Sequence, residues 1–203
     1  MQAENHISLE KTRFRGRLIL LLLILFFAVP LLLVLLMHHL DWHPQGQSRG
    51  QLITPARALQ IPAQLQDSRG ISIKPALWRD KWTMVYVAND CLQTCAARLH
   101  DMRQLHASLA KNIDRVQRVL ISASDHTQEL EKQYPDLIVI NQPKDALAQL
   151  QKQFDLAEGP AGQNERLYLV DPLGNLMMRY HASIPAAEIR KDLTRLLSYS
   201  WAG

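Results

Sequence analysis

The feature that most constrains this chain is an uninterrupted apolar run near its N-terminus. Leu18–Met37 contains twenty residues without a charge, most of them Leu, Ile, Val or Phe. At a rise of about 1.5 Å per residue, a helix of this length spans about 30 Å, the thickness of a bilayer's hydrocarbon core. Pro30 lies within the run, but proline is tolerated in membrane helices. The run therefore predicts one N-terminal transmembrane helix, over residues 18–38.

A cleaved signal peptide is the competing interpretation. Its apolar region is usually about 7–15 residues long and ends in small residues. This run is longer, and the sequence that follows, Met37-His38-His39-Leu40, is a poor cleavage site. We therefore expect an uncleaved anchor. His38, His39 and the nearby His43 are interpreted as polar residues at the lipid headgroups rather than as a metal site.

The charges on either side of the run predict its orientation, because basic residues stay on the cytoplasmic side of a membrane helix. Four basic residues precede the run and none follows it until Arg49; the four are Lys11, Arg13, Arg15 and Arg17. We therefore expect residues 1–17 in the cytoplasm and residues 41–203 outside. In a bacterium, this places the soluble domain in the periplasm, anchored to the inner membrane.

The remaining charges exclude one class of partner. Residues 41–203 hold 19 of the 23 basic and 17 of the 19 acidic residues, so this region is nearly neutral. Nucleic-acid binding needs a clustered basic surface that neutralises phosphates. We therefore expect no nucleic-acid partner.

The chain after the run divides into a polar segment and a domain. Residues 39–75 mix Pro, Gly, Gln and Ser with a few apolar residues, which indicates a linker and an N-terminal extension that can end in a short hairpin. In residues 76–203, strand-like apolar runs alternate with helical periodicities. We expect strands at Trp82–Ala88, Val116–Ala123, Leu137–Ile140, Leu167–Val170 and Leu176–His181, and helices at Asp90–Asn112, Thr127–Tyr134, Asp145–Phe154 and from Pro185 onward.

This order of elements predicts an α/β domain. Strands that alternate with helices favour a mainly parallel sheet covered on both faces. The last two strands are separated only by Asp171–Asn175, which predicts an antiparallel hairpin, and a helix follows them. The combination is typical of a thioredoxin-like domain with a central mixed sheet.

Cys91 and Cys95 are the only cysteines in the chain, so any thiol chemistry involves them as a pair. Cys91 follows directly on the first strand of the domain, and we expect it in the first helical turn, with Asn89 or Asp90 as the N-cap. The dipole of the helix favours a thiolate there, whereas the neighbouring carboxylate of Asp90 opposes it.

The spacing of four residues places both sulfurs on one helix face. In a regular helix the two Cβ atoms would lie about 5–6 Å apart, whereas a disulfide needs about 3.5–4.5 Å. Closing the bond would therefore distort the first turn, and the open pair suits a soft ion such as Cu(I). Packed thiols or a structural bridge are the alternatives, but so short a loop gains little stability from a bridge. Redox or metal chemistry is favoured.

Two stretches of the chain resemble the Sco/SenC family of cytochrome c oxidase assembly proteins: Trp82–Cys95 (WTMVYVANDCLQTC) and Tyr168–Gly174 (YLVDPLG). The resemblance implies a thioredoxin-like domain on a single-span anchor and a role in building the dinuclear copper site of the oxidase. It implies that Cys91 and Cys95 are copper ligands or redox thiols. The partner would be a cytochrome c oxidase subunit or another copper or thiol protein.

The chain also departs from the family pattern. Ala96 stands where the family has a proline after the second cysteine, and residues 162–165 lack the histidine that is the family's third copper ligand. The cis-proline that a thioredoxin places just before the strand predicted at Leu167–Val170 is also missing. The best substitute is His126, because it follows the second strand of the domain at the edge where the cysteine turn lies. His100 and His106 are too far around or along the helix to share an ion with both thiols, and His181 is interpreted as structural.

Three functions remain open. The first is a Sco-like assembly factor that passes Cu(I) or reduces partner cysteines, rather than a turnover enzyme. The second is a metal-free thiol–disulfide oxidoreductase, which the missing histidine favours. The third is a non-catalytic assembly or scaffold protein, in which the cysteines carry no chemistry.

Overall fold

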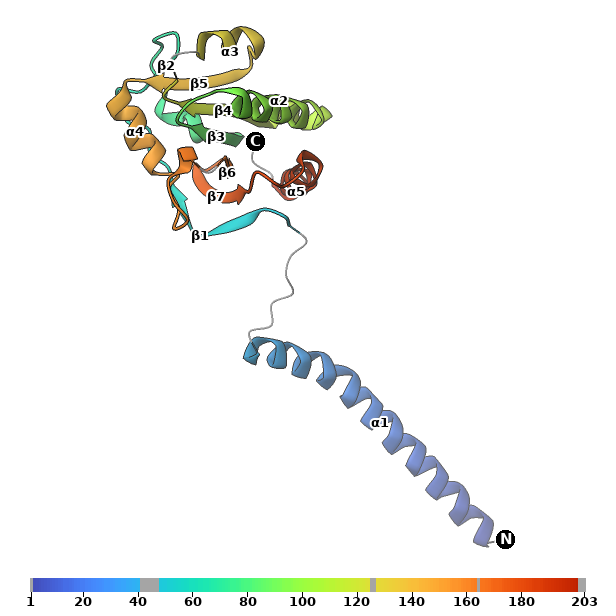
Figure 1. The fold of residues 1–203 in the computed structure, drawn as a ribbon. Coiled ribbons are helices and arrows are strands. Elements are labelled where there is room, and N and C mark those ends of the chain that lie inside the picture. Colours follow the sequence, from blue (N-terminus) through green and yellow to red (C-terminus); the bar gives the residue numbers. More distant parts are fainter. Residues whose placement is uncertain (1, 41–47, 125–126, 164, 201–203) are drawn as a thin grey trace. The chain divides into compact units, whose positions relative to one another are not determined.

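The computed structural model of the chain describes residues 2–40, 48–124, 127–163 and 165–200 (Figure 1). The chain forms two compact units, Met1–Gln47 and Ser48–Gly203. Helix α1 (Gln2–His39) accounts for the described residues of the first unit apart from Leu40. Within it, Arg15–His39 is long and apolar enough to cross a membrane. This segment contains the predicted span, residues 18–38.

The second unit is built on a mixed sheet with seven strands over the described residues. Its spatial order is β1-β7-β6-β3-β4-β5-β2. Strands β3, β4 and β5 are parallel, while β6, β7 and the two edge strands join antiparallel. The strands are β1 (Gln51–Ala58), β2 (Gln66–Asp67), β3 (Trp82–Ala88), β4 (Val116–Ser122), β5 (Leu137–Gln142), β6 (Leu167–Val170) and β7 (Asn175–Tyr180). The predicted central mixed sheet is confirmed.

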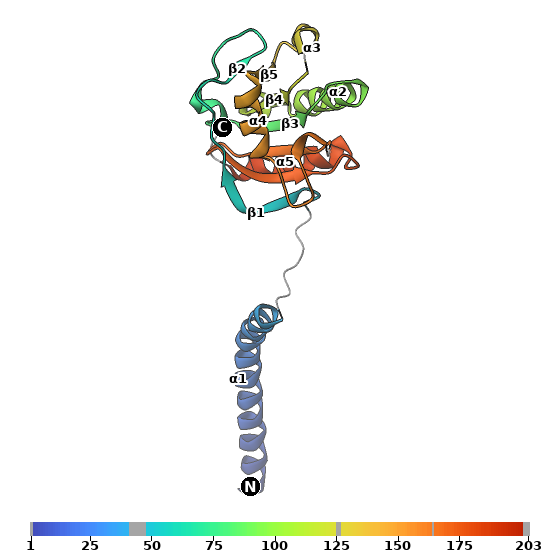
Figure 2. The ribbon, with the colours of Figure 1, turned by 60° about the vertical axis from the view of Figure 1, so that its left-hand side comes forward.

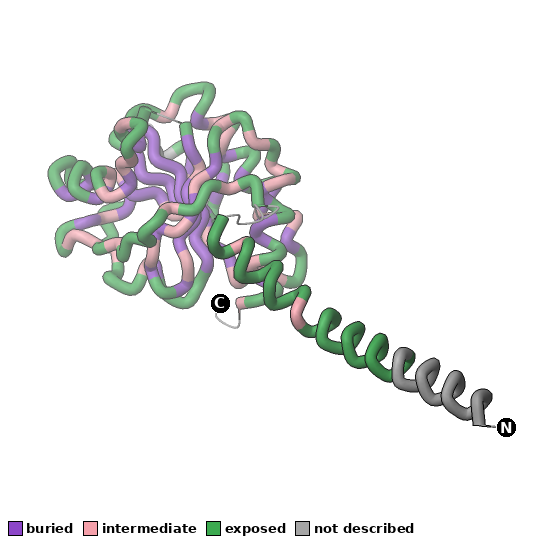
Figure 3. The backbone as a smooth tube through the Cα atoms, turned by 90° about the horizontal axis from the view of Figure 1, so that it is seen from below, coloured by how far each residue is buried: buried purple, intermediate pink, exposed green. Residues whose placement is uncertain are grey.

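Helices cover both faces of the sheet, as Figures 1 and 2 show. They are α2 (Gln93–Ala107), α3 (Thr127–Gln133), α4 (Lys144–Lys152) and α5 (Ala186–Tyr199). Alternate residues of β3 point to opposite faces: Met84 and Tyr86 pack in a core with α2, α3 and α5, whereas Val85 and Val87 pack in a core with α4. Every residue of β3 is buried, and the strands form the buried centre of the unit in Figure 3.

Several predicted elements agree with the structure to within a few residues, and β3 and β6 have the predicted bounds. The first helix of the domain is shorter than predicted. Helix α2 ends at Ala107, and the chain continues as the 3₁₀ helix Ala110–Arg115. Its first residue, Ala110, has a positive φ of 49°. Strand β1 lies within the segment expected to be a linker and extension. The sequence does not reveal it, because all but one of its residues are exposed and its side chains therefore show no apolar alternation.

The Asp171–Gly174 turn gives the structural reason for the YLVDPLG motif at Tyr168–Gly174. The N–H of Gly174 donates to the carbonyl of Asp171 (2.9 Å), with Pro172 at the second turn position, where its fixed φ is favourable. The Asp171 carboxylate accepts hydrogen bonds from the N–H groups of Leu173 (2.9 Å) and Asn175 (2.8 Å) and from the Asn175 amide (2.9 Å). Gly174 has a φ of +86°, which glycine adopts without strain. The motif therefore builds the β6–β7 hairpin.

We expect Asp171→Ala to lower the free energy of unfolding by about 1–2 kcal/mol, because three donors lose a charged acceptor at once. Urea unfolding followed by circular dichroism measures the change. Asp171→Asn is the matched control: it keeps one acceptor oxygen for the two backbone N–H groups and should lose less than half as much. Equal losses in the two variants would contradict this role for the carboxylate.

Candidate functional site

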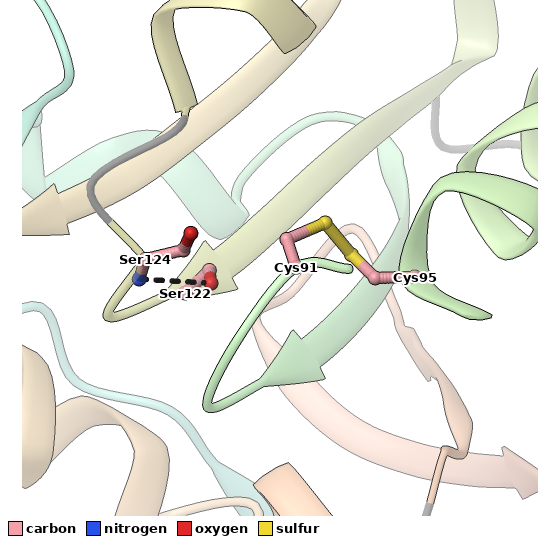
Figure 4. The surroundings of a disulfide bond; sticks show 4 residues. All are labelled: Cys91, Cys95, Ser122 and Ser124. Atoms are coloured by element: carbon pink, nitrogen blue, oxygen red, sulfur yellow. Dashed lines mark hydrogen bonds between the residues drawn. A yellow bond between two sulfur atoms is a disulfide. The ribbon is translucent and has the colours of Figure 1, made fainter. Parts of the chain in front are cut away.

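Cys91 and Cys95 form a disulfide at the carboxyl end of β3 (Figure 4). Strand β3 ends at Ala88, and Asn89 and Asp90 then turn the chain toward α2. Because β3 is central and wholly buried, it fixes this turn at the end of the sheet where the parallel strands have their carboxyl ends. The site is therefore held by the core of the domain rather than by a free loop.

The structure corrects the predicted position of Cys91. Helix α2 begins at Gln93 with Leu92 as its N-cap, in extended conformation and without a side-chain cap, so neither Asn89 nor Asp90 caps it. Cys91 lies outside the helix and Cys95 within its first turn. The predicted distortion assumed that both cysteines lie in one regular helical turn; here the extended residue Leu92 lets Cys91 reach Cys95 from outside the helix.

The two sulfurs differ in accessibility. Cys95 is 3% exposed and belongs to the core shared by β3, α2 and α5, whereas Cys91 is half-buried and packs against the margin of that core. Leu92, between them in sequence, is 66% exposed. A reacting group from outside can therefore approach Cys91 but not Cys95.

The loop that precedes β6 packs against the cysteine turn. The Asn89 N–H donates to the carbonyl of Gly162 (3.4 Å) in the 3₁₀ helix Ala161–Gln163. A Cβ on Gly162 would lie 2.2 Å from the Asn89 side-chain oxygen and 3.2 Å from its backbone nitrogen, so a larger residue here would have to displace the Asn89 side chain. This close approach places residues 161–163 beside the cysteines. At this place the chain offers Gly162 and Gln163; Asn164 lies outside the described residues.

The end of β4 forms another border of the site. Ser122 pairs in register with Ala88, and its hydroxyl oxygen accepts the N–H of Ser124 (3.2 Å); both serines are buried near the disulfide in Figure 4. The chain leaves β4 here toward residues 125–126. His126, the weak metal candidate, is one of these and lies outside the described residues.

The three other described histidines of the domain, His100, His106 and His181, each have a local partner. The Nε2 atom of His106 lies 3.0 Å from the carbonyl of Ile113 and 2.8 Å from that of Val116, at the opposite end of β4. His100 lies 3.1 Å from the amide of Gln104, and His181 lies 3.1 Å from the hydroxyl of Ser183. Among the described residues, no group of three His, Cys, Asp or Glu side chains could hold a metal ion. The two cysteine sulfurs are therefore the donors that this part of the chain offers.

Sequence reasoning missed two contributors to the site. Gly162 gives no sequence signal, because the residue that approaches it closely, Asn89, is distant along the chain. The hydroxyls of Ser122, at the end of a predicted strand, and Ser124, just after it, give no signal in the sequence, and only their burial near the disulfide sets them apart.

The fold is shared with solved Sco proteins. Copper-bound ScoI of Bradyrhizobium japonicum has a TM-score of 0.55 at 17% identity, covering 68% of this chain and 99% of that one. Copper-bound yeast Sco1 has a TM-score of 0.59 at 15% identity, covering 70% and 94%. BsSco, described as a Sco-family cytochrome c oxidase assembly protein with a disulfide switch, has a TM-score of 0.51 at 16% identity, covering 74% and 100%. At these identities the likeness shows the shared fold, and the match to a thioredoxin-like family model over residues 82–200 confirms the predicted thioredoxin-like domain.

Sequence comparison points the same way. No curated protein matches the chain significantly. Residues 82–200 match the family described as transmembrane-like, thioredoxin-like, C-terminal domain. Because this match spans more than half of its 203 residues, the chain belongs to the transmembrane-like, thioredoxin-like C-terminal domain family.

Proposed function

We propose that this chain is a Sco-like, membrane-anchored factor that assists the assembly of a cytochrome c oxidase through the thiols of Cys91 and Cys95. One observation carries the proposal: the two cysteines form a disulfide at the edge of a rigid sheet, with one sulfur accessible and the other buried. The disulfide switch described for BsSco, which shares the fold, supports it. The partner would be an oxidase subunit or another copper or thiol protein.

The accessibility of the two sulfurs assigns their order of reaction. The Cys91 thiolate attacks one sulfur of a partner disulfide, and the other partner sulfur leaves as a thiolate. The Cys95 thiolate then attacks the Cys91 sulfur, which closes the Cys91–Cys95 bond and releases the partner as a dithiol. Two electrons pass from this pair to the partner, and a dithiol reductant must then restore the reduced pair.

Delivery of Cu(I) is the second candidate reaction, because copper is bound in the Bradyrhizobium japonicum ScoI and yeast Sco1 structures that share the fold. Soft thiolates suit Cu(I), and Cys91 and Cys95 are the residues that would hold it in the reduced state. The loop beside them offers Gly162 and Gln163 rather than a third strong ligand. Among the described residues, the donor set fits two sulfur ligands and favours the thiol reaction over copper delivery.

The same proposal includes the location of the domain. We place residues 18–38 across the bacterial inner membrane, residues 1–17 in the cytoplasm, residues 39–75 as linker and extension, and residues 76–203 as the periplasmic thioredoxin-like domain. The length and composition of the apolar run in α1 support the span, and the excess of basic residues before that run supports the orientation.

Oxidase assembly in cells tests the role of the pair. In a strain that lacks the native protein, Cys91→Ser/Cys95→Ser should leave assembled oxidase, measured from its haem absorbance, at the level of the empty strain. Full assembly with this variant would contradict the proposal and leave a scaffold role.

Anaerobic Cu(I) titration of the full chain in detergent distinguishes copper delivery from the thiol reaction. Copper delivery requires one Cu(I) bound per reduced chain, and that binding must be lost in Cys91→Ser. An affinity no higher than that of a free dithiol would exclude copper delivery and leave the thiol reaction in place.

A further inference from the structure

A small apolar pocket lies between α2, β6 and α5. Buried or half-buried side chains form its floor and walls. Three charged side chains and one histidine also line it. The largely apolar lining consists of Tyr86, Met102, Leu105, Leu167, Ile184, Ala186 and Ile189. The more polar side chains are Arg98, Asp101, Glu165 and His181. The pocket has a volume of about 30 Å³. A single water needs about 10–15 Å³ on this measure, so one aliphatic side chain is the largest group that fits without rearrangement.

Two elements connect this pocket to the disulfide. Helix α2 holds Cys95 in its first turn and Arg98, which lines the pocket, three residues later. The loop before β6 touches Asn89 at Gly162 and lines the pocket at Glu165. A chain segment that presents a sulfur to Cys91 and runs along α2 toward Arg98 would therefore reach the pocket. The exposed Leu92 adds further apolar surface along the way.

The charges at the pocket indicate the chemistry of such a segment. Arg98 is already engaged, since its guanidinium donates to the carbonyl of Ala182 and lies 3.7 Å from Asp101. Among the described residues, Glu165 forms no salt bridge, and it is exposed. Glu165 and Tyr86 line the same pocket, and burial, followed by the negative charge of Glu165, raises the pKa of Tyr86 to about 12. A basic side chain would therefore be favoured beside the apolar one.

We propose that this pocket binds an apolar side chain of the partner segment that delivers its cysteine to Cys91, with a Lys or Arg facing Glu165. From Cys95 to Met102 the helix rises about 10 Å, which an extended chain covers in about three residues. The recognised partner segment thus has an aliphatic residue about three positions from its reactive cysteine. This inference rests on the proposed thiol reaction and names its substrate class.

Model peptides test the pocket on the full chain in detergent, with Cys95→Ser so that Cys91 is the sole thiol. Each peptide carries one cysteine as a mixed disulfide with thionitrobenzoate. The Cys91 thiolate forms a disulfide with the peptide, and the absorbance of released thionitrobenzoate gives the rate. Leucine three positions from the cysteine on both sides should speed the reaction about tenfold over serine at the same positions, as expected for one apolar side chain in a pocket. Equal rates would overturn the pocket.

A matched pair of variants locates the effect. Ala186 lines the pocket, whereas Ala187 is exposed next to it. Ala186→Leu should fill the pocket and abolish the preference for leucine, and Ala187→Leu should keep it. Loss of the preference in both variants, or in neither, would overturn the assignment. A peptide with Lys beside the leucine should also react severalfold faster than one with Glu, and Glu165→Gln should remove that difference.

A control separates this inference from the proposed function. The Cys95→Ser chain should react with a small aromatic disulfide that is too short to reach the pocket. A chain that reacts with the small disulfide but shows no leucine preference keeps the thiol function and loses the pocket. A chain that reacts with neither loses both.

Discussion

Cys95→Ser is expected to accumulate a covalent complex with the partner, at least tenfold above the complex seen with Cys91→Ser. Cys91 is accessible and forms the bond to the partner, whereas Cys95 is 3% exposed and can only resolve it. Without Cys95, the Cys91–partner disulfide has no internal thiol to break it. Non-reducing electrophoresis of acid-quenched membranes, with the tagged full chain, measures the trapped species.

The controls decide whether the complex reports the proposed order of reaction. The Cys91→Ser/Cys95→Ser variant should trap nothing, and added reductant should release the complex of Cys95→Ser. Equal trapping by Cys91→Ser would mean that Cys95 also meets the partner. That result would contradict the order of reaction that the burial of Cys95 implies.

Asp136→Asn is expected to lower the free energy of unfolding by about 2–3 kcal/mol, because it leaves a buried guanidinium without its counter-charge. Arg118 is fully buried, and its only salt bridge among the described residues runs to Asp136, with Nη2–Oδ1 at 2.6 Å and Nε–Oδ2 at 3.2 Å. The Tyr134 ring, 5.7 Å away, compensates only part of the charge. Urea unfolding at neutral pH measures the loss.

A matched variant and a rescue make this test specific. Asp114 is exposed and forms no salt bridge among the described residues, so Asp114→Asn should change stability by less than about 0.5 kcal/mol. Replacing the buried cation as well, in Arg118→Met/Asp136→Asn, should recover much of the loss, since an apolar side chain leaves no unpaired charge. An undiminished loss in the double variant would show that the charge of Arg118 is not the cause.

Acid should expose the same pair. Burial raises the pKa of Asp136, but the hydrogen bond and charge of Arg118 outweigh it and lower the pKa below its usual value. A lowered pKa contributes stability above the unfolded pKa of about 3.9, and that contribution disappears as the pH falls through the folded pKa. The hydrogen bond from Arg179 similarly lowers the pKa of Glu158 to about 2. Wild-type stability should therefore fall below about pH 4, and more steeply than that of Asp136→Asn.

The local pattern of the sequence determined much of this fold. The uncharged run Leu18–Met37 can satisfy its backbone only as a helix in a lipid environment, and the β-branched and aromatic run Trp82–Ala88 fits a buried strand. Alternating periods of two and 3.6 residues then order the strands and helices of an α/β domain. These signals are local, because each depends only on side chains a few positions apart.

The tertiary structure decided what depends on distant parts of the chain. Strand β1 exists because β7 offers an open edge, and its exposed side chains leave no periodic signal in the sequence. The difference in accessibility between Cys91 and Cys95 follows from the core, which buries the Cys95 sulfur and leaves Cys91 half-buried. The contact of Gly162 with Asn89 joins segments that are distant in the sequence, and the pocket forms where α2, β6 and α5 converge. Spacing along the chain determined which two residues form the pair, and packing decided what each of them can reach.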